Sequence, residues 1–292
     1  MKAMILAAGI GARLRPLTDH RPKALVEIAG HTLLEITLSR LRTFGVREVI
    51  INVHHFADMI VEYLKGHGNF GLRIEVSREE ALLDTGGGLK KASWFFLESP
   101  GGLDKPFFVH NVDIISTFDL ARMARFHAEN GALATVAVQD RETFRYLLFD
   151  KRLELCGRRY GRDGKNQLVR PSDRPQPLAF SCMHIISPRL FSMMTEDGAF
   201  PIFATYMRLA AHGQKILAFR GDEYYWRDLG TPEHVRQAES EIAFEQGAIV
   251  LRKPESNLRQ GWAEASRRIA KAGDDKLILP EFENQEDGDL QW

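Results

Sequence analysis

Short apolar runs without polar alternation recur along the first half of the chain, with amphipathic segments between them. The runs occupy residues 3–7, 46–53, 72–76, 106–111 and 133–138. Such a run is typical of a strand buried on both faces of a parallel sheet. Segments with helical spacing of apolar positions separate them, at residues 32–43, 58–64, 89–97 and 120–129. Strands that alternate with helices predict an α/β fold, with a Rossmann-like, doubly wound, mostly parallel sheet.

Two segments carry signals for the start of a helix. Residues 84–88 contain three glycines and open the helix over residues 89–97, with Thr85 as its expected N-cap. Thr231 and Pro232 place a capping residue before a proline, which predicts another helix start.

The middle of the chain is patterned differently. Residues 146–149 and 153–156 predict a hairpin, whereas residues 160–177 are polar and predict a long loop. A loop of this length is either functional, as a mobile lid or an insertion, or a solvated linker. Farther along, the pattern predicts strands over residues 178–186 and 215–219 and helices over residues 188–194 and 207–212.

The composition changes near residue 247. Residues 281–292 contain five acidic residues and neither Lys nor Arg, with Phe282 and Trp292 as apolar anchors. Such a segment buries little core of its own. We therefore predict a domain over residues 1–246 and an acidic C-terminal extension over residues 247–292.

Composition also narrows the class of protein. The formal net charge is zero, so there is no bulk basic field for nucleic acid. The first apolar run is too short for a signal-peptide core or a membrane span. Two cysteines, Cys156 and Cys182, make neither a disulfide framework nor a metal cluster. These features predict a cytoplasmic protein without nucleic-acid or membrane partners.

The first predicted strand runs into a loop of small residues. Ala8, Gly9 and Gly11 allow backbone N–H groups to approach an anion closely. Cations follow at Arg13, Arg15 and Lys23. This order predicts a phosphate-binding loop. Neither the third glycine of a dinucleotide fingerprint nor the Gly-Lys-Ser/Thr of a P-loop is present, so an ordinary turn with surface arginines is the alternative.

Two aspartates follow predicted strands. Asp113 comes after the strand that ends at Asn111, and Asp228 precedes the helix start at Thr231. Ligands of doubly wound sheets bind at the carboxyl ends of the strands, and Mg²⁺ favours carboxylate oxygens there. The alternative for each aspartate is a turn or capping role.

Two motifs resemble one family. The string Leu6-Ala7-Ala8-Gly9-x-Gly11-x-Arg13-Leu14-x-Pro16-Leu17-Thr18, with Pro22-Lys23 downstream, resembles the opening signature of the sugar-1-phosphate nucleotidyltransferases, or nucleotide-sugar pyrophosphorylases. The string Trp226-x-Asp228-x-Gly230-Thr231-Pro232 resembles their distal metal motif. The resemblance implies transfer of a nucleotidyl group from an NTP to a sugar 1-phosphate, with release of pyrophosphate.

The resemblance also assigns roles. The loop of Ala8, Gly9 and Gly11, together with Asn111, would hold the nucleotide. Arg15 would grip its phosphates, with Arg13 either assisting or lying free on the surface. Lys23 would contact the phosphate that is exchanged, and Asp113 and Asp228 would hold Mg²⁺. A catalytically weakened nucleotide sensor is the alternative from another class of function.

Residues 77–88 resemble the base-reading loop of the same family. Glu79 aligns with the position that reads the base edge, and Gly87 lies in the glycine run that packs against the nucleoside. An ionised carboxylate accepts the N–H groups of uracil or guanine, which favours UTP or GTP. A solvated surface charge is the alternative for Glu79. The triple glycine is most similar to N-acetylmuramate-1-phosphate uridylyltransferases and mannose-1-phosphate guanylyltransferase relatives.

Three features depart from the family pattern. Val112 replaces the glycine that usually precedes the metal aspartate, and Cys182 replaces a glycine in a strand on the substrate side, where a small β-rich insertion is implied. The Glu-Lys-Pro motif is absent, so Lys165 or Arg170 would supply the missing cation or else lie on a surface loop.

The extension over residues 247–292 has a resemblance of its own. Residues 251–254, 261–265 and 273–280 and the acidic end resemble the toxin-binding tails of MazE-type antitoxins. This implies a protein partner with a basic groove. The alternative is a variable extension that folds on its own enzyme or on a second subunit.

Overall fold

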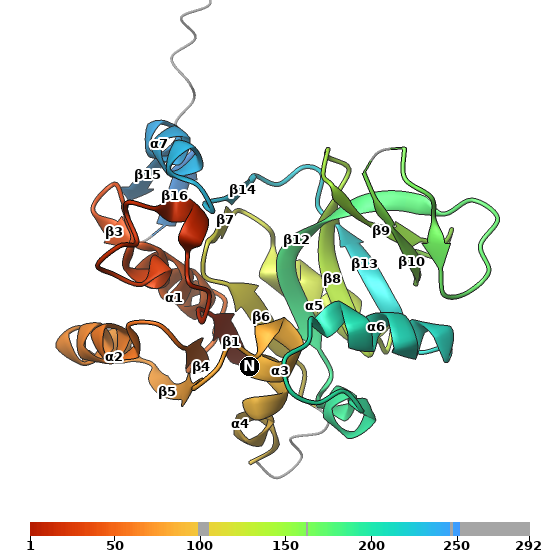
Figure 1. The fold of residues 1–292 in the computed structure, drawn as a ribbon, viewed down its shortest axis with the longest axis horizontal. Helices are drawn as coiled ribbons and strands as arrows, with labels where there is room; N and C mark the ends of the chain where they lie inside the picture. Colours follow the sequence, from red (N-terminus) through yellow and green to blue (C-terminus); the bar gives the residue numbers. More distant parts are fainter. Residues whose placement is uncertain (99–104, 162, 246–247, 252–292) are drawn as a thin grey trace, which may run out of the picture. The chain divides into compact units, whose positions relative to one another are not determined.

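The computed structural model describes residues 1–98, 105–161, 163–245 and 248–251. The main sheet of these residues has ten strands (Figure 1). Four neighbours are parallel, in the order β6 (Phe107–Asn111), β1 (Lys2–Leu6), β4 (Glu48–Val53) and β5 (Arg73–Arg78). The prediction of an α/β fold around a mostly parallel central sheet is confirmed.

The long strand β12 (Gln176–Ile186) joins this parallel core to the rest of the sheet. One edge of β12 pairs with β9 (Arg145–Phe149) along its first half and with β6 along its second half, both antiparallel. The other edge pairs with β8 (Ala134–Gln139), which lies parallel to β13 (Ile216–Arg220). Strands β10 (Leu155–Tyr160) and β11 (Gln167–Leu168) extend the antiparallel side beyond β9. The predicted hairpin is therefore present as β9–β10.

The parallel strands β1, β4 and β6 are buried on both faces, whereas β5 lies at the edge of the sheet and is partly exposed. Ala3 and Ile5 of β1 belong to one hydrophobic cluster, whereas Met4 belongs to a second. Helices α1 (Leu33–Thr43), α2 (Ala57–Gly66), α5 (Leu120–Glu129) and α7 (Pro232–Glu241) contribute to the first cluster. Helices α3 (Asp84–Lys91), α4 (Ser93–Leu97) and α6 (Ile202–Ala211) contribute to the second. Burial on both faces explains why these strands carry apolar runs without alternation.

Shorter elements connect the larger ones. They are the 3-10 turns η1 (Ala12–Leu14), η2 (Lys23–Leu25), η3 (Gly68–Gly71) and η5 (Pro188–Met193), and the strands β2 (Glu27–Ile28), β3 (His31–Thr32), β7 (Ile114–Ser116) and β14 (Trp226–Asp228).

The two predicted helix starts have different outcomes. The Thr231 hydroxyl accepts a hydrogen bond from the His234 N–H at 3.3 Å, so this N-cap is confirmed. The N-cap prediction for Thr85 is wrong: α3 already begins at Asp84, and the Thr85 hydroxyl accepts a hydrogen bond from the Ile202 N–H at 3.0 Å. The hydroxyl therefore ties α3 to the start of α6 instead of capping its own helix.

Two other boundaries differ from the predicted ones. The segment expected to be a loop over residues 160–177 is partly strand, because β10 runs to Tyr160 and β11 pairs with it. Helix α6 begins at Ile202, five residues before the predicted start at residue 207. In both places the local sequence pattern does not show the element, because contacts with other parts of the chain determine it.

The three consecutive glycines of α3 allow the helix to pack closely against its neighbours. A Cβ on Gly86 would collide with the ring of Phe200, and one on Gly87 would collide with the carbonyl oxygen of Gly198. A Cβ on Gly88 would lie 2.7 Å from Oε1 of Glu79. All three glycines are buried, so α3 approaches its neighbours at backbone distance.

We expect Gly87→Ala to lower the free energy of unfolding by about 2 kcal/mol or more, because the obstructing atom belongs to the backbone. Gly66→Ala is the matched control, since Gly66 is also helical and a Cβ there meets nothing within 4 Å. Its effect should stay within about 0.5 kcal/mol. Urea unfolding of the two variants tests this contrast, and equal midpoints would contradict it.

The last described strands cross the predicted domain boundary. Strand β15 (Ile242–Glu245) pairs antiparallel with β16 (Ala248–Leu251), so a hairpin spans residue 246. Residues 252–292 lie outside the described residues, and the interpretation of the acidic extension and its protein partner stays a prediction. No helix in the described ranges is both long and apolar enough to span a membrane.

Candidate active site

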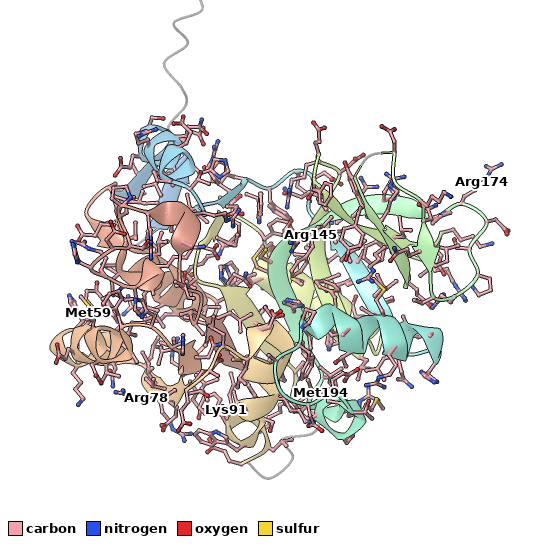
Figure 2. The ribbon with its side chains drawn as sticks, viewed as in Figure 1. Met59, Arg78, Lys91, Arg145, Arg174 and Met194 are labelled. Carbon is pink, nitrogen blue, oxygen red and sulfur yellow. The ribbon has the colours of Figure 1, made fainter. Side chains whose placement is uncertain are left out.

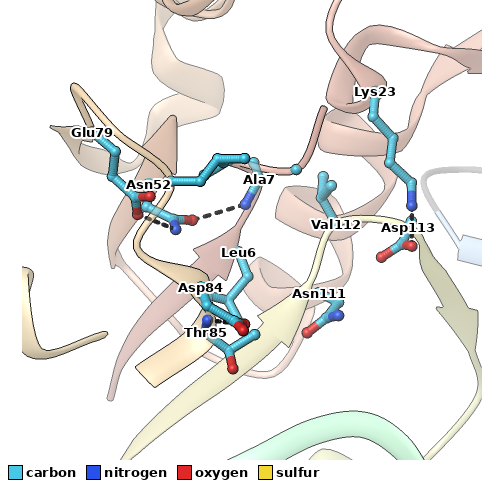
Figure 3. Close-up of a pocket in the computed structure, with 13 residues that line it drawn as sticks. Leu6, Ala7, Lys23, Asn52, Glu79, Asp84, Thr85, Asn111, Val112 and Asp113 are labelled. Atoms are coloured by element: carbon cyan, nitrogen blue, oxygen red, sulfur yellow. Dashed lines mark hydrogen bonds and ion pairs between the residues drawn. The ribbon is translucent and has the colours of Figure 1, made fainter. Parts of the chain in front are cut away.

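A pocket of about 420 Å³ opens at the carboxyl ends of the parallel strands (Figure 3). In the sheet, β1 lies between β4 and β6, so the chain leaves β1 to one side and later returns to its other side. Ligands bind at such a switch point in doubly wound sheets. Six of the predicted site residues line this pocket, namely Ala8, Gly9, Lys23, Glu79, Asn111 and Asp113.

The loop after β1 is held from two sides. The Ala7 N–H donates to Oδ1 of Asn52 at 2.8 Å, and the Thr18 hydroxyl donates to the Gly11 carbonyl at 2.9 Å. Gly11 has φ 71°, and a Cβ there would lie 3.0 Å from Cγ2 of Thr18. Within the described residues, the N–H groups of Ala8 and Gly9 have no hydrogen-bond partner. The loop therefore presents backbone donors to the pocket, as an oxyanion requires.

Asp113 and Asp228 come together through a short ladder. Strand β7, directly after Asp113, pairs antiparallel with β14, which places Asp228 opposite Ile114. The Leu229 N–H also donates to the Asp113 carbonyl at 2.9 Å. Lys23 reaches the same place, where its ammonium forms an ion pair with Oδ2 of Asp113 (Figure 3). One cation and two carboxylates from distant parts of the chain thus meet at the edge of the pocket.

The Glu79 carboxylate holds neighbouring segments together inside the protein. The Glu79 side chain is buried at 5% exposure, so the alternative of a solvated surface charge is wrong. Oε1 accepts from Nδ2 of Asn52 at 2.7 Å (Figure 3), and Oε2 accepts from the Leu83 N–H at 3.0 Å. Because Asn52 also holds Ala7, one network links the glycine-rich loop, β4 and the loop before α3.

Comparison with known proteins decides the family. A family model described as "Nucleotidyl transferase" matches residues 2–147. An N-acetylmuramate alpha-1-phosphate uridylyltransferase of Caulobacter vibrioides is 35% identical, and the match covers 82% of this chain and 96% of that protein. The chain belongs to the nucleotidyl transferase family.

Other relatives support the same assignment. A mannose-1-phosphate guanyltransferase of Yarrowia lipolytica is 30% identical over 80% of this nucleotidyltransferase, which spans only 61% of that longer relative. The crystal structure of HddC from Yersinia pseudotuberculosis superposes with a TM-score of 0.65 at 21% identity, covering 82% of this chain and 97% of the other. That likeness confirms the fold.

The carboxylate pair suits Mg²⁺. The described part of the nucleotidyltransferase contains no group of three or more His, Cys, Asp or Glu side chains placed to hold a metal ion. Two carboxylates with no further protein ligands match Mg²⁺, which keeps waters and takes the rest of its oxygen ligands from substrate phosphates. Asp113 and Asp228 therefore fit a metal that binds together with a nucleotide.

The valine that replaces the family's glycine at position 112 does not disturb the backbone before Asp113. Val112 does not share the positive φ found at seven other described non-glycine residues. Its N–H donates to the Leu6 carbonyl at 3.1 Å, and its side chain is buried in the core. A glycine is therefore not required here for its backbone conformation.

The departure at Cys182 has a structural consequence. Cys182 adopts φ 59° in the irregular stretch of β12 between Phe180 and His184. A left-handed backbone favours glycine, so the cysteine carries local strain. Burial, together with the negative charges of Asp113 and Asp228, raises the pKa of the thiol. The thiol stays protonated and contributes no nucleophile to the site.

Five predicted site residues do not line the pocket: Gly11 and Asp228, described above, and Arg13, Arg15 and Gly87. The Arg15 side chain is 68% exposed, and its Nε lies 3.4 Å from Oδ1 of Asp19. Gly87 packs against Gly198. Arg13 lies near Asp228 instead, because a Cβ on Gly230 would lie 2.9 Å from Nη2 of Arg13 and 2.7 Å from Oδ1 of Asp228. The assigned roles of Arg13, Arg15 and Gly87 stay predictions.

A second pocket of about 520 Å³ adjoins the first and shares Asp84, Thr85 and Asn111 with it. Its distinctive side chains are three arginines of β9 and β10, Arg145, Arg158 and Arg159. The sequence analysis missed these arginines. The available signal was the pair of arginines, Arg158 and Arg159, directly after a predicted hairpin strand.

The two suggested replacements for the missing lysine lie elsewhere. Arg170 donates to Asp150 at 2.6 Å and to Glu154 at 2.7 Å, which neutralises it within the hairpin. Lys165 is exposed and lines neither pocket. Among the described residues, the cationic side chains that line the second pocket are the β9–β10 arginines.

Proposed function

We propose that this nucleotidyltransferase transfers a nucleotidyl group from an NTP to a sugar 1-phosphate and releases pyrophosphate, with Mg²⁺ as its metal. The proposal is carried by the ion pair of Lys23 and Asp113 in the first pocket, with Asp228 placed beside Asp113 by the β7–β14 ladder. The names of the relatives support it, because both the uridylyltransferase and the guanyltransferase act on sugar 1-phosphates.

The two pockets divide the substrates between them. The first pocket, with the free N–H groups of Ala8 and Gly9, takes the nucleotide and its phosphates. The second, lined by aromatic and basic side chains, takes the sugar 1-phosphate. Asn111 lines both and lies at the boundary where the two phosphates meet.

The chain's own residues then act by positioning and charge. An oxygen of the sugar phosphate forms a bond to the α-phosphorus in line, and the bond from that phosphorus to the β-phosphate oxygen breaks, so pyrophosphate leaves. Lys23 offsets negative charge that develops on the α-phosphate, and the loop N–H groups orient the phosphates. Asp113 and Asp228 would hold Mg²⁺, which would supply positive charge that offsets the negative charge of the substrate phosphates.

Uracil or guanine is the proposed base. The Glu79 carboxylate lines the pocket, and each of its oxygens has lone pairs beyond the hydrogen bonds that it already accepts. Those lone pairs suit the N–H groups of uracil or guanine, whereas the ring edge of adenine offers no imino donor. Glu79 would thus hold its loop and read the base with the same group.

Pyrophosphate release across four NTPs and several sugar 1-phosphates tests this function. The acceptors include N-acetylmuramate, N-acetylglucosamine, mannose and glucose 1-phosphates, each with Mg²⁺ and with a chelator. We expect release with UTP or GTP and at least one acceptor, abolished by the chelator. Silence across the whole grid, with nucleotide binding intact by calorimetry, would instead support a nucleotide sensor.

A further inference from the structure

Three consecutive residues, 139–141, at and just after the end of β8 hold the segment of residues 221–226 that leads to Asp228. The Gln139 side chain donates to two carbonyls of this segment, at 2.9 and 2.8 Å. The next N–H along the chain donates to a carboxylate oxygen of the segment at 2.6 Å. Arg141 follows and contacts the last residue of the segment. The approach to Asp228 is therefore fixed by side chains from β8 as well as by the β7–β14 ladder.

Arg141 and Trp226 form a pair that joins β14 to β12. The guanidinium carbon of Arg141 lies 3.6 Å from the ring centroid of Trp226. Nη2 of Arg141 donates to the Phe180 carbonyl at 2.7 Å, and the indole N–H of Trp226 donates to the Ser181 carbonyl at 2.9 Å. A cation stacked on an indole ring is a favourable arrangement, and the two hydrogen bonds fix its orientation. The pair therefore ties β14 to a strand of the main sheet.

The irregular stretch of β12 supplies the two carbonyl acceptors. The register of β12 against β8 shifts between Phe180 and His184. Within the described sheet, residues 181 and 182 pair with none of the neighbouring strands β6, β8 and β9. A bulge of this kind leaves backbone groups without ladder partners and changes their direction. The left-handed backbone of Cys182 thus belongs to a stretch of β12 that offers its carbonyls to Arg141 and Trp226.

Trp226 and Asp228 lie on the same face of β14, because alternate residues along a strand share a face. Arg227, between them, points to the other face and forms an ion pair with Glu241 of α7. The guanidinium over Trp226 is therefore on the side of β14 that carries the Asp228 carboxylate. Burial lowers the pKa of Arg141, and the negative charge of Asp228 is among the effects that oppose this shift, which agrees with their proximity.

Arg141 is fixed in place without being paired to a carboxylate. The described residues contain no ion pair of Arg141, and its buried Nε has no hydrogen-bond partner among them. Lys23 differs, because its ammonium forms an ion pair with Asp113. Removal of Lys23 would free a metal carboxylate, whereas removal of Arg141 would free none. The two cations are therefore expected to affect metal binding in opposite directions.

We propose that Arg141 is a positioning residue for the metal site: stacked on Trp226 and bonded to β12, it fixes the face of β14 that presents Asp228. The proposal rests on the proposed function, in that Asp228 is taken as a metal ligand, and goes beyond it by assigning the residue that holds this ligand in place. Arg141 lines neither of the two pockets, so it acts through Trp226 and not on a substrate.

Metal binding to the full-length enzyme tests this role directly. Mn²⁺, which takes the same kinds of oxygen ligand as Mg²⁺, is titrated without nucleotide and followed by water proton relaxation. Arg141→Met should weaken Mn²⁺ binding about tenfold, because residues that orient metal ligands typically contribute at least that much to metal affinity. The Mg²⁺ concentration for half-maximal pyrophosphate release should rise by a similar factor.

Three further variants separate positioning from charge and from stability. Arg141→Lys keeps the charge but loses the planar, stacked group, so it should lose nearly as much affinity as Arg141→Met. Arg122→Met removes another arginine that lies over an aromatic ring, that of Phe219, and should leave Mn²⁺ affinity unchanged. Arg174→Met, at an exposed arginine labelled in Figure 2, controls for the loss of one positive charge. Urea unfolding of each variant reports its stability.

A double-mutant cycle shows whether Arg141 acts through Asp228. Asp228→Asn already removes the metal ligand, so adding Arg141→Met or Arg141→Lys in that background should weaken Mn²⁺ binding by less than about twofold. An equally large loss in both backgrounds would show that Arg141 supports the fold in general, which overturns the positioning role.

The remaining outcomes are also decisive. Unchanged or tighter Mn²⁺ binding in Arg141→Met would overturn the proposal, as would full affinity in Arg141→Lys, because charge alone would then suffice. If Arg141→Met does not fold, Arg141→Lys and its cycle with Asp228→Asn decide. A wild type that binds no Mn²⁺ would overturn the carboxylate pair and the positioning role together. A wild type that binds Mn²⁺ but releases no pyrophosphate would overturn the transferase and leave the Arg141 comparison valid.

Discussion

An Asp113→Asn variant is expected to lose about a thousandfold in kcat, on the order of 4 kcal/mol of transition-state stabilisation. Asp113 belongs to the carboxylate pair that is proposed to hold the metal, and its side chain is only 14% exposed. An amide oxygen is neutral and binds Mg²⁺ less strongly, so the Mg²⁺ concentration for half-maximal rate should rise as well. Pyrophosphate release at saturating NTP and acceptor, titrated with Mg²⁺, measures both effects.

Two companion variants make this result specific. Asp228→Asn should show the same double effect, because Asp228 completes the pair through the β7–β14 ladder. Asp197→Asn serves as control, since its side chain is 88% exposed and pairs only with Lys90 at the surface. Activity of Asp113→Asn within a few fold of the wild type, with Asp228→Asn inactive, would place the metal on Asp228 alone.

Lys23→Met is the second variant with a large expected effect. Its kcat should fall about three-hundredfold, because a cation aimed at developing charge in a partly buried site is worth several kcal/mol. Lys23 also competes with the metal for Asp113, since the two side chains form an ion pair. Apparent Mg²⁺ affinity in the absence of nucleotide should therefore increase in Lys23→Met while turnover falls.

An increase in apparent Mg²⁺ affinity together with a fall in turnover distinguishes a catalytic cation from a structural one. Lys65→Met, at an exposed position of α2, is the matched control and should alter neither quantity. Calorimetric Mg²⁺ titrations and single-turnover rates report the two effects separately. Unchanged turnover in Lys23→Met would remove the lysine from the proposed mechanism, whatever happens to the metal.

The sequence predicts the parallel core well because its physical signal is local. A strand covered on both faces is apolar at most positions, and β1, β4 and β6 show this directly, with Asn52 and His110 as buried polar exceptions. The N-cap role of Thr231 is equally predictable from the sequence, since Thr231 caps its own helix. Thr85 is not, because its partner Ile202 lies far along the chain and only the folded state brings the two together.

The residues of the candidate site also differ in how well the sequence predicts them. Lys23 and Asp113 are adjacent to recognisable motifs, and the fold brings them into contact. The contributions of Glu79 and Arg141 depend on their partners in space. Glu79 is engaged by Asn52 and Leu83, and Arg141 is held by Trp226 and the bend of β12. Neither relationship leaves a pattern in the linear sequence.

The attachment of β9–β11 has a consequence for the descent of this enzyme. These strands join the main sheet along the first half of β12, whereas the strands beside the reaction centre pair with its second half or with each other. On the proposed function, mutations that accumulate in β9–β11 would alter which acceptor is used while Lys23, Asp113 and Asp228 keep their places. Lineages that inherit this sheet would then diversify their sugars without passing through an inactive ancestor.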